Sequence, residues 1–311
     1  MLNLSVIGQL KKKDSISDHA FRVKYLRRSR ELYRRYLESK PWIKQLYSNM
    51  FNIKAGQRIV EIGCGTGDFT RYLAQLSHAN ARFLGIDSNP KSINAAVNDT
   101  KKARLSKMIA YKSGDVYNIP LENDYANITC CRTLLMHLTD PMKAVTEMTR
   151  VTRTGGSVIA VEGGKMASFY DPADEEHTRM VERAYDAWTN GIRKLEGKEF
   201  KIGEKLPYIF QKAGLTNIRA EIHADAWLNT DRRRKLNDIR ADIRFNYSIF
   251  KERRRRDRKY LLAGGLTNKW ITSYFQLEED VIRKQLDYSD EELRNDATVY
   301  GARFFLVSGI K

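Results

Sequence analysis

The chain has 311 residues, of which 42% are hydrophobic, so it suits one large domain or a core with an insertion and can bury a sizeable core. Three cysteines are too few for a disulfide framework, and no apolar run approaches the roughly 18 residues of a membrane span. The residues before the first lysines are too weakly apolar for a secretory signal, so we expect a cytoplasmic protein. The net charge of +17 is concentrated in residues 11–44, with 12 Lys/Arg against 4 Asp/Glu, and in residues 231–260, with 13 against 5; the remainder is nearly neutral.

Residues 15–50 have the apolar spacing of one long helix or of two consecutive helices, with Ser15 or Ser17 as the N-cap. Such a segment either packs an aromatic stripe on the core with its charges in water, or it covers a ligand site.

A glycine-dense bend follows the first predicted strand, residues 57–62, and precedes a helix over residues 69–76. Its glycines, Gly63, Gly65 and Gly67, let backbone N–H groups approach a ligand, and the helix start adds a positive dipole end. A dinucleotide fingerprint is excluded because its third glycine position is occupied by Asp68.

Polar residues also follow the next predicted strands. The second strand, residues 82–86, ends at Asp87, and Pro90 then opens a helix. The third strand leads into Ser113-Gly114-Asp115-Val116, and the fourth, from residue 125, leads into the segment Arg132-Thr-Leu-Leu-Met-His137-Leu-Thr-Asp-Pro.

These four segments, in this order, resemble the class I S-adenosylmethionine-dependent methyltransferases, in particular the small-molecule, UbiE-like branch, over about residues 55–225 and 298–309. The resemblance implies that S-adenosylmethionine is the cofactor, that the bend holds its amino-acid end, that Asp87 accepts from the ribose hydroxyls, and that Asp115 accepts from the adenine amino group. A lid tyrosine, Tyr25 or Tyr33, would touch the methionine end, and Arg132 would meet the cofactor carboxylate or pair with a local acid. The cofactor-binding residues expected on this basis are Glu61, Gly63, Cys64, Gly65, Gly67, Asp87, Ser88, Gly114, Asp115, Val116, Arg132 and Tyr25.

Strand and helix alternation continues to the end of the chain. Residues 157–161 form a fifth strand that delivers Glu162 to the ligand-binding edge, where it is either a substrate residue or a solvated loop carboxylate. A helix over residues 172–196, a sixth strand over 216–222 and a last strand over 299–307 complete the pattern.

About 75 residues separate the sixth and seventh strands, where the common fold has a short connection. This insertion holds the runs 232–235 and 253–256, and four successive arginines cannot share one face of a helix because side chains rotate by about 100° per residue. The insertion is therefore interpreted either as a solvated helix pair or as a contact surface for an anionic substrate or RNA.

The sulfonium methyl of the expected cofactor is already activated, so catalysis mainly requires an aligned nucleophile. His137 and Glu162 are the candidate catalytic residues, His137 as a general base or as a packing residue. No Cys/His set has zinc spacing, so no metal site is predicted, and the Asn/Asp-Pro-Pro-aromatic and Pro-Cys motifs of nucleobase enzymes are absent from the sequence.

The alternation of strands and helices predicts an α/β fold, and the resemblance implies a doubly wound, Rossmann-like sheet of seven strands, six parallel and the last antiparallel. We expect a helical lid (1–52), a cofactor-binding core (53–225), a basic helical insertion (226–298) and a last core strand (299–311). The first functional hypothesis is methyl transfer to O, N or C of a small metabolite, and an anionic metabolite is one alternative within it. The second is an RNA or protein methyltransferase that docks through residues 231–260, and the third is a non-enzymatic sensor that binds the same cofactor.

Overall fold

The computed structural model describes residues 40–77, 80–164 and 168–311, which form two compact units. We call them the sheet unit (44–77, 80–164, 198–224 and 303–311) and the helical unit (40–43, 168–197 and 225–302). The predicted lid residues 1–39, Tyr25 among them, lie outside the described residues. This division differs from the expected insertion in that residues 168–197 group with 225–302.

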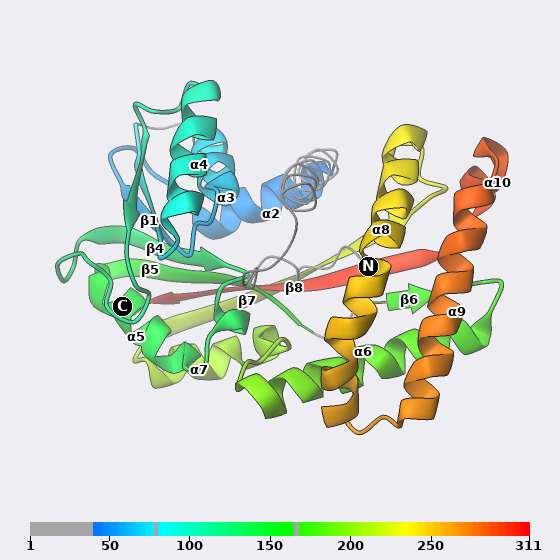
Figure 1. Ribbon diagram of the computed structural model, residues 1–311. Helices are drawn as coiled ribbons and strands as arrows, with labels where there is room; N and C mark the ends of the chain where they lie inside the picture. The colour runs from blue at the N-terminus through cyan, green and yellow to red at the C-terminus, as the bar shows by residue number, and fades with distance from the viewer. Residues whose placement is uncertain (1–39, 78–79, 165–167) are drawn as a thin grey trace. The chain divides into compact units, whose positions relative to one another are not determined.

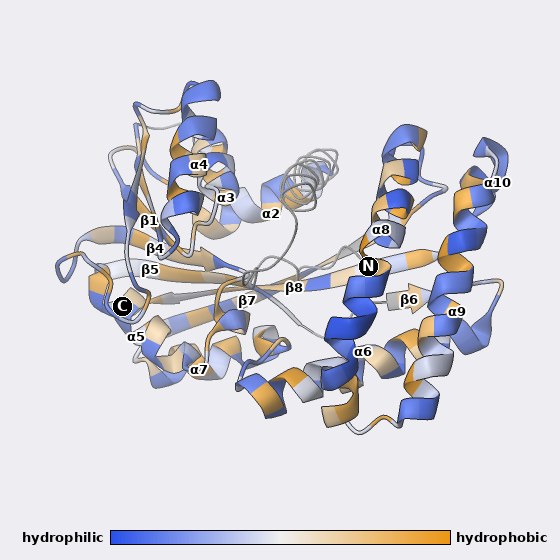
Figure 2. Cartoon of the chain, in the orientation of Figure 1, coloured by the Kyte–Doolittle hydropathy of each residue, from blue (hydrophilic) through white to orange (hydrophobic). Residues whose placement is uncertain are grey.

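The sheet unit alternates strands and helices as the sequence predicts. In chain order it contains most of α2 (Pro41–Phe51), then β1 (Arg58–Ile62), α3 (Asp68–Leu76), β2 (Arg82–Asp87), α4 (Pro90–Lys102), β3 (Ile109–Ser113), β4 (Ala126–Arg132), the 3₁₀ turn η2 (Leu135–His137), α5 (Pro141–Val151), β5 (Thr152–Gly163), η3 (Ile202–Lys205) and α7 (Leu206–Lys212), together with parts of β7 (Thr216–Leu228) and β8 (Val299–Ile310). Helices α3 and α4 cover one face of the sheet, and α5 and α7 cover the other (Figure 1). The central strands β1 and β4 are buried along most of their length because helices cover both faces of the sheet there, and their residues are mainly apolar (Figure 2).

The strand order confirms the doubly wound fold and corrects the number of strands. Strands β3, β2, β1, β4 and β5 pair in parallel in that order, and β8 pairs antiparallel with β5. Strand β7 also pairs with β8; Thr216 bonds to Ile310 while His223 stacks on Phe304, so β7 runs antiparallel to β8. Within the described residues the sheet has eight strands rather than the predicted seven, because a short strand β6 (Ser168–Tyr170) adds to β8.

The helical unit is built from α6 (Glu175–Glu196), α8 (Leu236–Ala263), α9 (Asn268–Asp287) and α10 (Asp290–Asn295). Helices α6 and α8 approach closely at Gly191, where an added Cβ would lie 1.8 Å from the carbonyl oxygen of Tyr260. Helix α8 is one continuous helix of 28 residues through the second arginine run. In residues 40–77, 80–164 and 168–311, no helix is both long enough and apolar enough to cross a membrane.

A buried ionic network lies inside the helical unit. The ring of His177 is placed with Nδ1 2.8 Å from Asp171 Oδ2 and Nε2 3.2 Å from Glu278 Oε1. The other oxygen of Glu278 lies 2.6 Å from Arg253 Nη2. Burial opposes ionisation of Glu278, but Arg253 and His177 outweigh it and lower its pKa to about 2. Burial likewise opposes protonation of His177, but its two carboxylate partners raise its pKa above the ordinary value.

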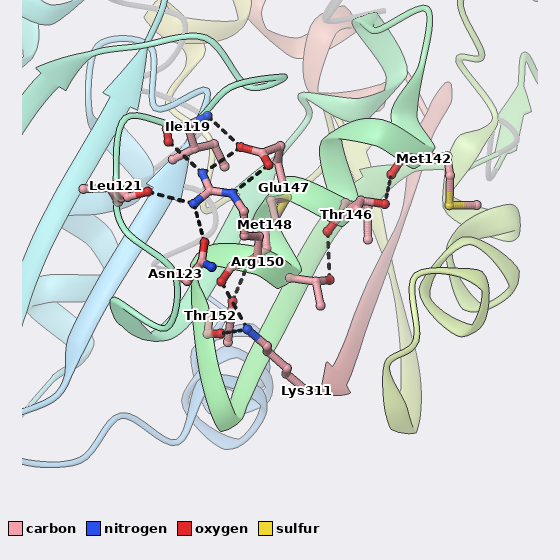
Figure 3. A network of polar contacts seen from close by, with 12 residues as sticks. Ile119, Leu121, Asn123, Met142, Thr146, Glu147, Met148, Arg150, Thr152 and Lys311 are labelled. Atoms are coloured by element: carbon pink, nitrogen blue, oxygen red, sulfur yellow. Dashed lines mark hydrogen bonds and ion pairs between the residues drawn. The ribbon is translucent and has the colours of Figure 1, made fainter.

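Arg150 near the end of α5 ties the loop before β4 to the sheet unit (Figure 3). Its guanidinium donates to the carbonyl oxygens of Ile119 and Leu121 and to Asn123 Oδ1, each at 2.9 Å. It also forms a two-pronged ion pair with Glu147, at 2.8 Å for both contacts. Fork geometry of this kind is specific to arginine.

Replacing Arg150 with Met is therefore expected to lower the free energy of unfolding by about 2–3 kcal/mol, since several charge-assisted bonds to a loop are lost together. Arg153→Met is the matched control: that side chain is exposed, so the change should stay within about 0.5 kcal/mol. Urea unfolding of both variants measures the difference, and equal losses would contradict the interpretation.

Candidate functional site

The ends of four parallel strands meet at one edge of the sheet. Ile62, the last residue of β1, pairs with Ile86 in β2 and with Cys131 in β4, and Asp87 pairs with Ser113 at the end of β3. In a parallel sheet this carboxyl edge is where ligands bind. It brings together the predicted residues that follow these strands: Gly63, Asp87, Gly114, Asp115 and Arg132.

The bend after β1 requires glycine at three positions. Gly63, Gly65 and Gly67 have φ of 71°, 52° and 74°, in the left-handed region that other residues avoid. A Cβ at Gly67 would lie 2.2 Å from the hydroxyl oxygen of Tyr111, whereas a Cβ at Gly65 would meet no atom within 4 Å. The bend is thus packed at its end and open at its middle, where a ligand can approach the backbone.

Asp87 connects the bend to the end of β2. Its Oδ2 accepts a hydrogen bond from the N–H of Gly65 at 2.8 Å, and its Oδ1 accepts one from the N–H of Asn89 at 2.8 Å. The side chain is half-buried. A carboxylate offers about four acceptor positions, so each oxygen can accept one more hydrogen bond from a pair of hydroxyl groups.

The remaining predicted cofactor residues of this edge are partly accessible. Ser88 and Asp115 are exposed, and Gly114 and Val116 are half-buried. Asp115 Oδ1 accepts a hydrogen bond from the N–H of Tyr117 at 2.9 Å, which fixes the carboxylate at the end of β3.

Glu61 and Cys64 lie on the sheet side of the bend. Glu61 is 2% exposed, accepts a hydrogen bond from Thr70 Oγ1, and has its pKa raised to about 7 by burial. Burial also raises the pKa of the Cys64 thiol. Arg132 is half-buried, with its guanidinium 5.4 Å from the centre of the Phe69 ring. Glu61 and Cys64 therefore support the bend, and their contact with a cofactor stays a prediction.

Glu162 is fully buried at the end of β5, so its interpretation as a solvated loop carboxylate is wrong. Its Oε1 accepts hydrogen bonds from the N–H groups of Leu134 and Leu135, both at 2.8 Å, and its Oε2 accepts one from Met136 at 3.4 Å. Burial raises its pKa to about 7 in spite of these bonds. The carboxyl group holds the turn η2 in place, and a catalytic role for it stays a prediction.

His137 ends the turn that Glu162 holds. Its ring packs edge-on against Phe200, with centroids 5.2 Å apart and planes at 87°. Burial, with a contribution from Lys198, lowers its pKa to about 4. The imidazole is therefore neutral at neutral pH and is a weaker base than an ordinary histidine.

Comparison with known proteins finds a family with a similar sequence in this region. Residues 60–160, which include the bend, Asp87, Asp115 and His137, match the family described as methyltransferase domain. Residues 60–160 are therefore similar to a methyltransferase domain. The chain is 30% identical over 142 residues to a 37.1 kDa protein of transposon Tn4556 from Streptomyces fradiae, covering 45% of this chain and 40% of that protein. It is 21% identical to a demethylmenaquinone methyltransferase of Staphylococcus saprophyticus, covering 58% of this chain and 79% of that protein.

Solved structures agree with the fold of the methyltransferase domain. The YcgJ protein of Bacillus subtilis superposes with a TM-score of 0.51 at 16% identity, covering 86% of this chain and 97% of that one. At this identity the likeness shows the fold alone. The chain spans about half or less of the length of the first two curated relatives it matches, 40% and 55%, so its activity as a whole protein is treated as a proposal below.

The residues at this edge of the sheet fit S-adenosylmethionine. The open middle of the bend at Gly65 accepts a ligand against its backbone, and the free acceptor positions of Asp87 suit a ribose diol. Asp115 is fixed and exposed one strand further along the sheet.

Sequence reasoning missed the side chains that brace the bend. The buried guanidinium of Arg71 donates to the carbonyl oxygen of Thr66 at 2.8 Å and to Asp68 Oδ1 at 2.7 Å. The Asp68–Arg71 spacing of i, i+3 could have indicated this pair. Nothing in the pattern indicates that Tyr111, which bonds to Thr100 at 2.9 Å, packs beneath Gly67 and Gly85.

The imidazole of His137 is expected to titrate near pH 4 instead of near its ordinary pKa of 6.5. Because the unfolded chain takes up this proton first, stability falls as pH decreases from about 6.5 towards 4. NMR titration of the ring protons, assigned with His137→Gln, measures the midpoint. Lys198→Ala should move it upward by removing a nearby positive charge, and a midpoint of 6.5 in the unmodified protein would contradict the burial argument.

Proposed function

We propose that the chain catalyses methyl transfer from S-adenosylmethionine to O, N or C of a small molecule. The observation that carries the proposal is the placement of the Asp87 carboxylate against the N–H of Gly65, at the edge where four strand ends meet. The family match over residues 60–160 supports the same reaction.

The donor would supply a methyl group on a positively charged sulfur: a nucleophile in line with the C–S bond would bond to the methyl carbon, and the sulfur would leave as a neutral thioether. The chain's own residues bind and orient the donor. The bend at Gly65 presents backbone N–H groups to it, Asp87 accepts hydrogen bonds from its ribose hydroxyls, and Asp115 accepts one from its adenine amino group. Near-attack positioning of this kind can supply several kcal/mol of the barrier. A ring nitrogen of neutral His137 accepts a hydrogen bond from the O–H or N–H of the methyl acceptor and orients it for attack; because the pKa of His137 is lowered to about 4, the ring is a weak base at neutral pH.

A small acceptor is supported by the relatives that are named demethylmenaquinone methyltransferases, of which the chain covers up to 81%. We assign Glu162 a positioning role in this reaction, since its oxygens hold the turn that ends at His137. Glu162→Gln would then lower kcat and shift the pH profile of His137, whereas a purely structural residue would change stability alone.

The test is to incubate the purified protein with methyl-labelled S-adenosylmethionine and a fractionated cell extract. Label is expected in the small-molecule fraction and is expected to disappear with Asp87→Ala. Label in the RNA or protein fraction would favour the macromolecular alternative. Absence of label from every fraction, with the cofactor bound, would overturn the proposal in favour of a sensor.

A further inference from the structure

The arginine run of α8 is divided between two faces of the helix. Arg253 is paired with the buried Glu278 at 2.6 Å. Arg256 is paired with Asp257, Nε to Oδ1, at 2.8 Å. These two cations are neutralised by carboxylates of the helical unit itself.

The second face carries cations at positions i, i+3, i+4 and i+7 of α8, which lie on one side of a helix. They are Lys251, Arg254, Arg255 and Arg258. With Phe250 and Glu279 they line a groove of about 380 Å³ on the helical unit. We call these four residues the basic face; this part of α8 is strongly hydrophilic in Figure 2.

The cations of the basic face are not neutralised by carboxylates of the residues that the structure describes. In the part of the chain that the structure describes, no carboxylate lies within 4.0 Å of the charged nitrogen atoms of Lys251, Arg254 or Arg255, and Arg258 donates to the neutral Asn268 at 2.8 Å. The acid among the lining residues, Glu279, is paired with Arg283 at 2.7 Å. The groove therefore presents about four uncompensated positive charges.

We propose that the basic face binds the phosphodiester backbone of single-stranded nucleic acid. Guanidinium groups match phosphate geometry with two parallel hydrogen bonds, and three of the four cations are arginines. The first and last of them are separated by about 10 Å along the helix, which suits a chain of successive phosphates better than one small anion.

An anionic membrane surface fits the basic face less well. Interfacial helices insert several exposed apolar side chains beside their cations, whereas Phe250 is 2% exposed and α8 has one exposed large apolar side chain, Leu262, at 40%. A groove lined by six side chains is also narrow for a duplex. The proposal does not depend on methyl transfer, and binding tests it directly.

The experiment is fluorescence anisotropy of the full chain with labelled 12-residue oligo(U) and oligo(dT) between 50 and 200 mM salt. Four phosphate contacts on a single strand predict a slope of log K against log salt of about −2.8, which is an approximately 50-fold loss of affinity over this range. Replacing all four cations of the basic face with Gln should abolish this dependence. Lys251→Gln with Arg255→Gln, both exposed, should reduce the slope by about half.

The matched control neutralises four exposed lysines of the sheet unit, on and after α4: Lys91, Lys101, Lys102 and Lys107. This control removes the same net charge as the quadruple variant of the basic face, and it should retain at least half of the slope of log K against log salt. Equal losses in the two quadruple variants, tighter binding of a 12-base-pair duplex or of vesicles with anionic lipid, or equal binding of a 12-residue oligoglutamate would each overturn the proposal. Circular dichroism melting confirms that each variant is folded.

Discussion

Asp87→Ala is expected to lower the affinity for S-adenosylmethionine by about 100-fold or more. The substitution removes the two acceptor oxygens offered to the ribose, and hydrogen bonds to a charged group contribute about 1.5–3 kcal/mol each. It also releases the N–H of Gly65, which Asp87 holds at 2.8 Å, so the bend loses its fixed position. Calorimetric titration measures the affinity. Asp87→Asn retains one acceptor oxygen, so its affinity should lie between that of the natural protein and that of Asp87→Ala.

Asp124→Ala is the matched control for this prediction. Asp124 also accepts from a backbone N–H, that of Thr154 at 3.1 Å, and from a second donor, Lys311 at 2.9 Å. It precedes β4, at the opposite edge of the sheet from Asp87. Its loss should change cofactor affinity by less than about threefold, since a surface ion pair contributes little and lies far from the bend. Undiminished affinity in Asp87→Ala, or equal losses in both variants, would show that the cofactor binds elsewhere.

The cofactor edge could be predicted because its signals are local. Asp87 ends its strand, Gly65 and Asp115 follow theirs within three positions, and adjacent parallel strands end at the same edge. The doubly wound sheet with an antiparallel last strand came from the family resemblance, and the parallel pairing of β1 with β2 and β4 and the antiparallel pairing of β5 with β8 confirm it.

The roles of Glu162 and of the arginine run could not be predicted, because their partners are distant in the sequence. Glu162 is interpreted from its strand as an edge carboxylate, yet it accepts from amides 27 and 28 positions earlier. Rotation along a helix shows that the run 253–256 must divide between faces. Which face is buried depends on Glu278, 25 positions from Arg253 and on another helix.

Glu278→Ala is expected to lower the stability of the helical unit by about 3–5 kcal/mol, the usual result of removing one partner of a buried ion pair. The substitution leaves the guanidinium of Arg253 and the ring of His177 facing each other without the carboxylate that lies 2.6 Å and 3.2 Å from them. Glu279→Ala changes the next residue of the same helix, whose partner Arg283 is half exposed, and should cost less than about 1 kcal/mol.

The stability lost in Glu278→Ala should depend on pH, because the charges of Glu278 and His177 both contribute to it. The pKa of Glu278 is lowered from 4.5 to about 2, so its contribution to stability is complete above pH 4.5 and disappears as pH falls towards 2. The pKa of His177 is raised above 6.5, so the contribution of its positive charge is complete below pH 6.5 and disappears as pH rises through the folded-state pKa. The difference between the natural protein and Glu278→Ala is therefore greatest between about pH 4.5 and 6.5.

Urea unfolding followed by tryptophan fluorescence at pH 3, 5.5 and 9 measures this difference, because all four tryptophans, Trp42, Trp188, Trp227 and Trp270, belong to the helical unit. Replacing Arg253 and Glu278 together with Met should recover part of the loss, since no unpaired member of that ion pair then remains buried. A Glu278→Ala loss that is equal at the three pH values, or no larger than that of Glu279→Ala, would mean that Glu278 contributes packing and no charge. The recovery by the double replacement would then also be absent.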